Sequence, residues 1–211
     1  MSIRVAGRLA LAAVLALVAT PVLAVPITGL YNTGQDVLLG VDQAYQLVSA
    51  PLGVSTPSAY VQTTIPGSWV AGSWIGPNDG DGSTSTGTDP GGLYIYHLAV
   101  DLTGLEHLTA VISGSWATDN NSEIFLNGLS TGFTTGFTGF GSLTNFTISS
   151  GFIPGMNTLE FRVTNGSQSS GNPSGLLVAN LEGTADVVPE PATLLLLGSG
   201  LTALALRRRR H

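Results

Sequence analysis

Short segments in which apolar and polar residues alternate recur through the middle of the chain. The clearest are residues 93–102, 109–116 and 158–164, with shorter ones at 45–48, 59–63, 124–126, 145–149 and 176–181. A period of two places every second side chain on the same face of a β-strand. No long stretch between the two ends shows the 3.6-residue period of an amphipathic helix. The middle of the chain is therefore predicted to be built from strands.

Turn-forming residues separate these segments. They are Gly104, Asp119-Asn120-Asn121, Asn127-Gly128, Pro154-Gly155 and Asn172-Pro173. Gly, Asn, Asp and Pro favour turns because of their backbone preferences and their local hydrogen bonds. Many short strands joined by such turns predict an all-β fold, a β-sandwich.

The charges are distributed unevenly along the 211 residues. The chain has no cysteine, which excludes a disulfide scaffold, a thiolate zinc site and a cysteine nucleophile. Its formal net charge of −6 argues against a nucleic-acid-binding protein. Residues 25–188 hold twelve acidic side chains and a single basic one, Arg162, which is a net charge of −11. This charge disfavours anionic membranes as partners, and also anionic polysaccharides unless a cation bridges the two, so that among glycans a neutral one is the better candidate ligand.

The N-terminus has the three parts of a secretory signal peptide. Arg4 and Arg8 precede an apolar run at residues 9–18, and a small-residue cleavage pattern ends at Ala24. An N-terminal membrane anchor is the alternative, but the run is short for a span of roughly 20 residues. Residues 1–24 are therefore predicted to be removed after Ala24 during export.

The C-terminus combines a proline motif, a short apolar stretch and a basic cluster. These parts are Pro189, Glu190 and Pro191, then residues 192–206, then Arg207, Arg208, Arg209 and Arg210 before His211. As a helix with a rise of about 1.5 Å per residue, the stretch would be about 22 Å long, against roughly 30 Å for a bilayer core. Arginines prefer the cytoplasmic side. The pattern predicts a short transmembrane helix, either a plain tail anchor or part of a processing signal.

This tail resembles the PEP-CTERM sorting signal of Gram-negative bacteria. Its three parts occur in the same order at the extreme C-terminus, over residues 187–211. The resemblance implies that the tail holds an exported protein transiently at the inner membrane. It also implies that an exosortase cleaves near the motif and passes the protein to the cell surface or an exopolysaccharide matrix. The chain would then be the substrate of a processing enzyme.

The middle of the chain resembles galactose-binding-like domains. The resemblance spans about residues 32–185, and Tyr45 stands where a Trp is expected. Its most distinctive pieces are Trp116-Ala117-Thr118-Asp119-Asn120, Leu126-Asn127-Gly128 and Gly155-Met156-Asn157-Thr158-Leu159. It implies a jelly-roll β-sandwich over residues 25–186, of the kind found in bacterial surface proteins and in accessory modules of glycoside hydrolases.

A sugar site needs an exposed aromatic face beside polar groups that pair with hydroxyls. Trp69 and Trp74 lie in a Pro/Gly-rich connection that could present them, and Asp119, Asn120 and Asn127 offer polar partners. The alternative is that both tryptophans cap the sandwich, Trp116 is in the core, and the polar residues serve turns.

The sequence offers weak signals for a metal. Residues 78–82 are rich in Asp and Gly, but the EF-hand pattern fails because Thr84 and Pro90 occupy its positions six and twelve. A structural calcium site made from scattered carboxylates and carbonyls remains open, and no other cofactor is predicted. His97 and His107 lack the spacing of metal ligands.

Enzymatic activity is not predicted. Glu123 and Glu160 are the candidate pair for glycosidic cleavage, but no pattern brings them together, and no nucleophile elbow or phosphate-binding loop is present. Glu160 and Arg162 share one face of a strand, which predicts an outward ion pair worth under about 1 kcal/mol.

Two functional hypotheses remain for the exported domain. The first is a carbohydrate-binding module that engages polysaccharide through Trp69, Trp74 and nearby Asn and Asp groups. The second is a structural or adhesive surface protein that self-associates and binds no glycan. The Gly-Phe-Thr repeat at residues 132–141 fits the second hypothesis as a sticky loop. We interpret it instead as a long connection or edge strand whose Phe residues cover the core.

Overall fold

The computed structural model describes residues 23–78, 89–167, 171–188 and 198–200. These residues form twelve β-strands and two single-turn 3₁₀ helices, η1 (His107–Thr109) and η2 (Gly139–Gly141). The strands are β1 (Ala24–Pro26), β2 (Val37–Leu38), β3 (Val41–Ser49), β4 (Ser58–Val61), β5 (Ile75–Gly76), β6 (Gly92–Asp101), β7 (Val111–Asp119), β8 (Asn121–Leu126), β9 (Leu129–Thr135), β10 (Thr144–Ile148), β11 (Met156–Asn165) and β12 (Gly175–Asp186). This confirms the predicted all-β fold, a sandwich of the jelly-roll type.

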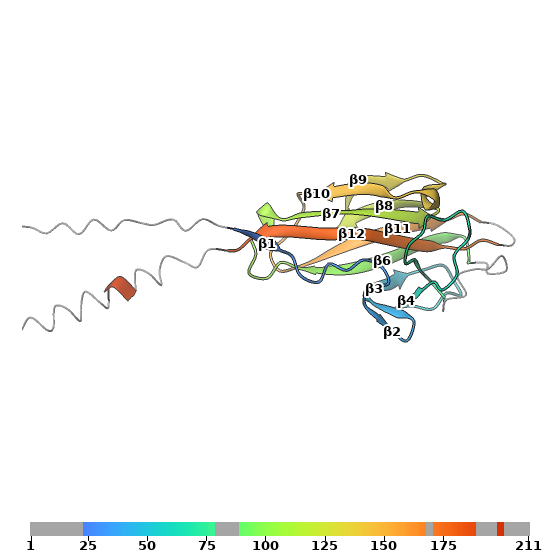
Figure 1. Ribbon diagram of the computed structural model, residues 1–211, viewed down its shortest axis with the longest axis horizontal. Helices are drawn as coiled ribbons and strands as arrows, with labels where there is room; N and C mark the ends of the chain where they lie inside the picture. Colours follow the sequence, from blue (N-terminus) through green and yellow to red (C-terminus); the bar gives the residue numbers. More distant parts are fainter. Residues whose placement is uncertain (1–22, 79–88, 168–170, 189–197, 201–211) are drawn as a thin grey trace, which may run out of the picture.

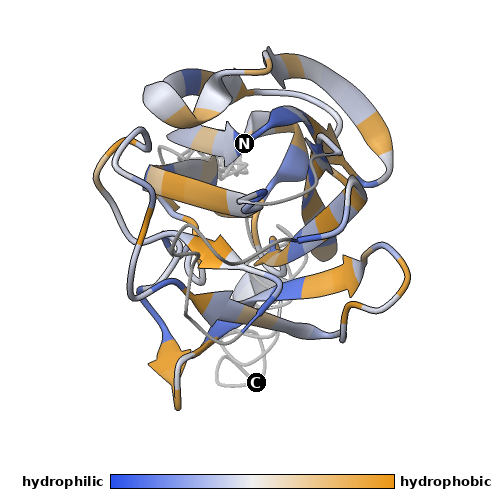
Figure 2. Ribbon diagram, turned by 90° about the vertical axis from the view of Figure 1, so that its right-hand side faces the viewer, coloured by the Kyte–Doolittle hydropathy of each residue, from blue (hydrophilic) through white to orange (hydrophobic). Residues whose placement is uncertain are grey.

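The strands pair in one antiparallel path that folds over itself into two layers (Figure 1). The order is β10-β7-β12-β5-β4-β3-β6-β11-β8-β9, with β1 added to β12 and β2 added to β3. The layer β10-β7-β12 and the layer β3-β6-β11-β8-β9 enclose the core, and the short strands β4 and β5 connect them. Seen end-on, the strands surround the interior (Figure 2).

The core follows the predicted alternation. On β6, Tyr94, Tyr96, Leu98 and Val100 are buried, and the intervening side chains are more exposed. The same holds on β11 for Leu159, Phe161 and Val163. Trp116 of β7 is fully buried and packs edge-on against Phe146, with ring centroids 5.5 Å apart. Trp116 is therefore a core residue.

The eight strands expected from alternation are all present, with shifted ends. Four further strands are present: β9, and the strands β1, β2 and β5, which are only two or three residues long and too short for alternation to reveal. Most of the Gly-Phe-Thr repeat's first half forms the end of β9, which pairs with β8 and ends the sheet path. Its Phe133 packs against the core, in agreement with the edge-strand interpretation.

A second, smaller apolar cluster covers the outer side of the β7–β12 layer. The connection between β4 and β5 folds over this layer, so that Trp69 and Trp74 pack against Ala117 and Leu177. The two indole rings lie 4.1 Å apart between centroids. β7 and β12 are therefore buried on both faces where this connection covers them.

The two ends of the sandwich differ. β12 begins at Gly175, opposite Asp119, and ends at Asp186, opposite Ala24. Ala24 and Val188 thus lie at the same end of the sandwich (Figure 1), and the start of β12 lies at the other. The strand, at about 3.3 Å per residue, separates the two ends by about 40 Å. We call them the terminal end and the loop end.

Several predictions fall on residues outside the described part of the chain. These are the signal peptide up to residue 22, the Asp/Gly-rich stretch from Asp79, and most of the tail after Val188. No helix among the described residues is long and apolar enough to cross a membrane.

Candidate functional site

A cleft of about 490 Å³ opens at the loop end of the sandwich. Residues 64–69 form one wall, the junction of β7 and β8 forms the floor, and Phe137, Phe140 and residues 171–173 form the remaining walls. Aromatic, proline and isoleucine side chains make much of this lining. The cleft therefore combines apolar surface with a few polar groups, as small-molecule sites do.

Three of the five sequence-predicted site residues line this cleft: Trp69, Asp119 and Asn120. They are brought together because β7 delivers Asp119 to the loop end while the connection after β4 folds over the outer face of β7. The Trp69 indole N–H donates a 2.9 Å hydrogen bond to the Asp119 carboxylate. This bond fixes both the ring and the carboxylate at the cleft wall.

Asp119 is the single ionisable residue among those that line the cleft. Its pKa is raised to about 6, chiefly by burial; the hydrogen bond from Trp69 opposes the shift, and the negative charge of Asp89 adds to it. The lining includes no cationic side chain that could compensate the carboxylate.

Asn120 holds the neighbouring loops in place. Its side-chain oxygen accepts a 2.7 Å hydrogen bond from the Gly166 N–H, and its amide donates to the Phe137 carbonyl at 3.4 Å. Asn172 adds a second link by donating to the Gly166 carbonyl at 2.7 Å. Because these bonds join separate loops, the cleft is largely pre-formed.

Phe137 is the cleft residue that sequence reasoning missed. Its side chain is 57% exposed, which makes it the described aromatic residue with the most accessible ring in the lining. Phe140 lies beside it and packs against the Trp69 cluster. The signal was the Gly-Phe-Thr repeat, but the repeat alone does not reveal which ring faces the core and which faces solvent.

The burial of Trp74 corrects one expectation. Its side chain is 0% exposed and its indole N–H donates to the Val70 carbonyl at 2.8 Å, so it presents no face to a ligand. Trp69 lines the cleft but is only 6% exposed, so it offers little surface to a ligand. Both tryptophans cap the sandwich, as the alternative interpretation has it, because the connection that carries them packs onto β7 and β12.

Asn127 lies at the opposite end of the molecule from the cleft. It occupies the Asn127-Gly128 turn between β8 and β9, with a positive φ of 53° that this turn requires. Its amide donates to Asn157 at 2.8 Å, and its oxygen accepts from the Thr158 N–H at 2.9 Å. Asn127 therefore serves the turn and is not part of the cleft.

A group of charged residues lies on the outer face of β11, away from the cleft. Glu160 pairs with Arg162 at 2.9 Å and lies 3.7 Å from His97, and the guanidinium stacks on Phe125 at 3.6 Å. The ion pair is as predicted, but Glu160 is not solvated: its side chain is only 9% exposed. The ring of Phe125 and the guanidinium of Arg162 cover this part of the sheet.

Glu123 and Glu160 do not form an acid/base pair around an open cleft. Glu123 stands opposite Arg162 in the β8–β11 register and accepts a hydrogen bond from Ser130, while Glu160 is engaged by Arg162. In the described part of the chain, no group of three or more His, Cys, Asp or Glu side chains is placed to hold a metal ion.

One comparison with known proteins identifies the tail. Residues 187–210 match the PEP-CTERM protein-sorting motif. The chain carries a PEP-CTERM sorting signal. Such a signal implies an exported protein that an exosortase processes and that its tail anchors in a membrane. The resemblance read from the Pro-Glu-Pro motif, the apolar stretch and the arginines is thereby confirmed.

Solved structures similar to this chain include family 35 carbohydrate-binding modules (CBM35). The module from Paenibacillus barcinonensis is 18% identical, with a TM-score of 0.34 over 71% of this chain and 96% of its own. The module from Clostridium thermocellum is 10% identical, with a TM-score of 0.34 over 59% and 86%. CBM35 from Cellvibrio japonicus Abf62 is 13% identical, with a TM-score of 0.30 over 66% and 90%. No curated protein sequence matches the chain.

Proposed function

We propose that this PEP-CTERM protein is a non-enzymatic cell-surface or matrix protein whose loop-end cleft binds a neutral glycan. The observation that carries the proposal is the convergence of Trp69, Asp119 and Asn120 with Phe137 in one cleft. An exposed aromatic ring can pack against the apolar face of a sugar, and a fixed carboxylate can accept hydrogen bonds from its hydroxyls. The cleft supplies one of each.

The charge of the cleft favours a neutral ligand. Asp119 carries the single ionisable group of the lining, and no lining side chain is basic. A carboxylate or sulfate on the glycan would meet Asp119 without a compensating cation, in a domain that already carries eleven net negative charges. Neutral hydroxyl groups meet no such repulsion.

The same lining is the reason for proposing a binding protein and not a glycosidase. Hydrolysis of a glycosidic bond ordinarily uses two carboxyl groups at a fixed separation. The cleft offers one, Asp119, and its charged neighbour Asp89 is occupied by hydrogen bonds from Asn78 and the Ser174 N–H.

Replacing Phe137 tests the proposal. The full chain, purified in mild detergent, is run by affinity electrophoresis through gels containing a panel of neutral polysaccharides. Migration is expected to be retarded in at least one gel. Phe137→Ala is expected to lower the affinity measured from that retardation about five- to tenfold, because a stacking contact worth about 1–1.4 kcal/mol is lost.

The matched control is Phe125→Ala, which removes a ring from the outer face of the sheet, away from the cleft. It is expected to leave retardation unchanged. Unretarded migration on every neutral polysaccharide, or equal losses for the two variants, would contradict glycan binding at the cleft.

Self-association is the second candidate function, and one surface favours it. The tip of the β2–β3 hairpin exposes Val37, Leu38 and Leu39, the last of them 94% exposed. Exposed apolar clusters of this kind often mark contact sites between proteins. Sedimentation of the full chain with and without Leu38→Ser and Leu39→Ser distinguishes the candidates. An oligomer that is lost in the Leu38→Ser and Leu39→Ser variants, combined with unretarded migration in the gels, would favour a structural, self-associating protein.

A further inference from the structure

The sorting motif begins inside the folded domain. The PEP-CTERM match starts at residue 187, but backbone pairing continues through Val187 and Val188. Pro189 follows at once, so no spacer separates the folded strand from the Pro-Glu-Pro motif. The processing signal and the domain therefore share a boundary.

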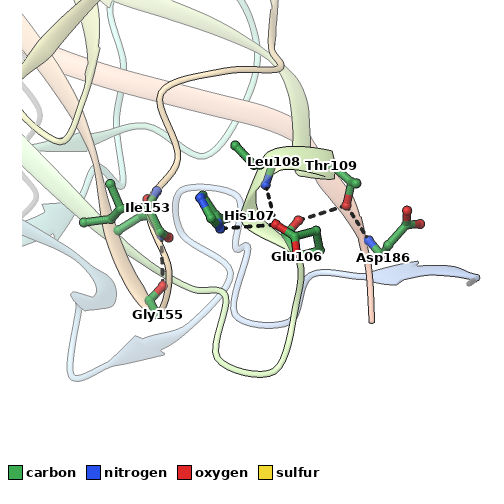
Figure 3. A network of polar contacts seen from close by, with 8 residues as sticks. Glu106, His107, Leu108, Thr109, Ile153, Gly155 and Asp186 are labelled. Atoms are coloured by element: carbon green, nitrogen blue, oxygen red, sulfur yellow. Dashed lines mark hydrogen bonds and ion pairs between the residues drawn. The ribbon is translucent and has the colours of Figure 1, made fainter. Parts of the chain in front are cut away.

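Two segments hold the end of β12 from opposite sides, and we call them together the terminal clamp. On one side is β1, whose Val25 and Pro26 stand opposite Ala185 and Thr184, whereas Ala24, opposite Asp186, leaves with the predicted signal peptide. On the other side is the turn at residues 104–109 (Figure 3). The clamp covers both edges of the last strand before the motif.

The hydrogen bonds from the turn are short and specific. The Asp186 N–H donates to the Thr109 hydroxyl at 2.8 Å (Figure 3), and the Asp186 carbonyl accepts from the Glu106 N–H at 2.7 Å. The Val188 N–H donates to the Gly104 carbonyl at 3.0 Å. Thr109 is itself fixed, because its hydroxyl donates to the Glu106 carbonyl at 2.9 Å.

Pairing of this kind protects a peptide bond from cleavage. Enzymes that bind an extended peptide pair with its backbone N–H and C=O groups. A segment whose groups already pair inside a folded domain must first open locally, which costs free energy. Pro189 and Pro191 have no N–H to donate, so neither can donate a ladder hydrogen bond beyond Val188.

We propose that the terminal clamp sets the N-terminal limit of processing, so that the peptide bond cut by the exosortase lies on the C-terminal side of Val188. The cut breaks one amide C–N bond. Its acyl group passes to water or to an acceptor amine, and the leaving nitrogen gains the proton. The mature protein keeps β12 intact and with it the pairing of Val25 and Pro26 with Ala185 and Thr184.

The mass of the mature protein tests where the cut falls. The full chain is expressed in a host that contains an exosortase, and the processed form is recovered and measured by intact-mass and C-terminal peptide mass spectrometry. The mature chain is expected to end at Val188 or at a later residue. A mature C-terminus at residue 187 or earlier would overturn the proposal. Glycan binding has no bearing on either result.

A variant of the clamp tests whether the hydrogen bonds are the cause. Purified full chain in detergent is digested briefly with subtilisin, and the first cuts are mapped. In the wild type these cuts at the C-terminal side are expected to begin after Val188. Thr109→Val removes the acceptor of the Asp186 N–H while keeping the shape of the side chain. It is expected to add cuts within residues 184–187 and to speed hydrogen exchange of the Asp186 amide about five- to tenfold.

The control is Thr131→Val, which removes a comparable hydroxyl bond, to the Ile124 carbonyl, on the edge strand β9, which does not pair with β12. It is expected to leave the cuts within residues 184–187 and the Asp186 exchange rate unchanged. Identical digestion of the Thr109→Val variant and the wild type would show that the clamp does not protect the segment, and this too would overturn the proposal.

Discussion

At the scale of single residues, the cleft depends on a carboxylate held without a cation. Asp119 is almost fully buried, accepts the Trp69 indole N–H, and lies near a second carboxylate, Asp89. A buried, ionised carboxylate destabilises the folded state unless further hydrogen bonds or an opposite charge compensate it. Hydroxyl groups of a bound ligand that donate hydrogen bonds to Asp119 would provide this compensation.

The pH dependence of stability should report this cost. The pKa of Asp119 is raised from its ordinary value of 3.8 to about 6. Between these two pH values, the folded state therefore holds a proton that the unfolded chain has released. The contribution of Asp119 to stability is therefore present at low pH and is lost as the pH rises through about 6. Asp119→Asn keeps an acceptor for Trp69 but does not titrate.

In urea denaturation, the free energy of unfolding of the Asp119→Asn variant relative to wild type is expected to rise by about 1–2 kcal/mol between about pH 4.5 and pH 7.5. The wild type loses the contribution of its protonated carboxyl over this interval, whereas the amide of the variant loses nothing. A wild-type–variant difference that stays constant over this interval would contradict the raised pKa.

Glu160 offers a second prediction at this scale. Its buried carboxylate relies on Arg162, which donates two hydrogen bonds to it at 3.1 and 2.9 Å. Arg162→Met would leave the carboxylate buried beside its strand neighbours without that partner. The free energy of unfolding is expected to fall by about 1–3 kcal/mol. The double variant with Glu160→Gln should recover part of this loss, whereas Glu123→Gln alone should cost less than Arg162→Met.

At the scale of elements, the alternation of apolar and polar residues predicted the strands, but no sequence pattern predicted how the connections pack. β6, β7 and β11 could be predicted because their inward faces pack in one core, where a period of two is enforced by burial. Trp69 and Trp74 sit in a connection whose residues carry no period. Its packing onto β7 and β12 depends on close contact between segments that are distant in the sequence, which no local pattern encodes.

The Gly-Phe-Thr repeat illustrates the same limit at the cleft. Phe133 packs on the main core, Phe140 packs on the Trp69 cluster, and Phe137 is exposed in the cleft. The three residues have nearly identical sequence neighbours. Whether each side chain is buried or exposed therefore depends on where β9 ends and η2 begins. Trp69, Asp119 and Asn120 could be nominated from residue type, but their meeting in one cleft could not.

The start of β12 couples the fold to the cleft through a glycine. A Cβ at Gly175 would lie 2.6 Å from Cη2 and 2.7 Å from Cζ3 of the Trp69 ring. Gly175→Ala is therefore expected to displace the indole, weaken its bond to Asp119 and cost about 1–3 kcal/mol of stability. Thermal unfolding and tryptophan fluorescence measure the two effects.

Gly136→Ala is the matched control, since a Cβ there would have no neighbour within 4 Å. Its unfolding free energy is expected to change by less than about 0.5 kcal/mol. If both alanine variants behaved alike, the close packing of Trp69 against β12 would be wrong.

At the scale of the whole molecule, β12 separates the sorting motif from the proposed binding cleft. The strand begins at the cleft and ends at the sorting motif, so the two sites lie about 40 Å apart. While the tail is anchored, the terminal end is the part of the domain nearest the membrane. We therefore expect the loop end to be directed away from the membrane, where the proposed glycan ligand would be accessible.

This orientation can be measured because the chain has no cysteine, so an introduced thiol is unique. Ser68→Cys places it at the rim of the cleft, and Leu108→Cys places it on an exposed residue at the terminal end. The full chain is reconstituted in liposomes and labelled with a bulky maleimide. Ser68→Cys is expected to react as fast in liposomes as in detergent, whereas Leu108→Cys should react severalfold more slowly in liposomes. Equal slowing at both positions would mean that the domain lies flat on the membrane, and a cleft in that position would not be free to bind a glycan before release.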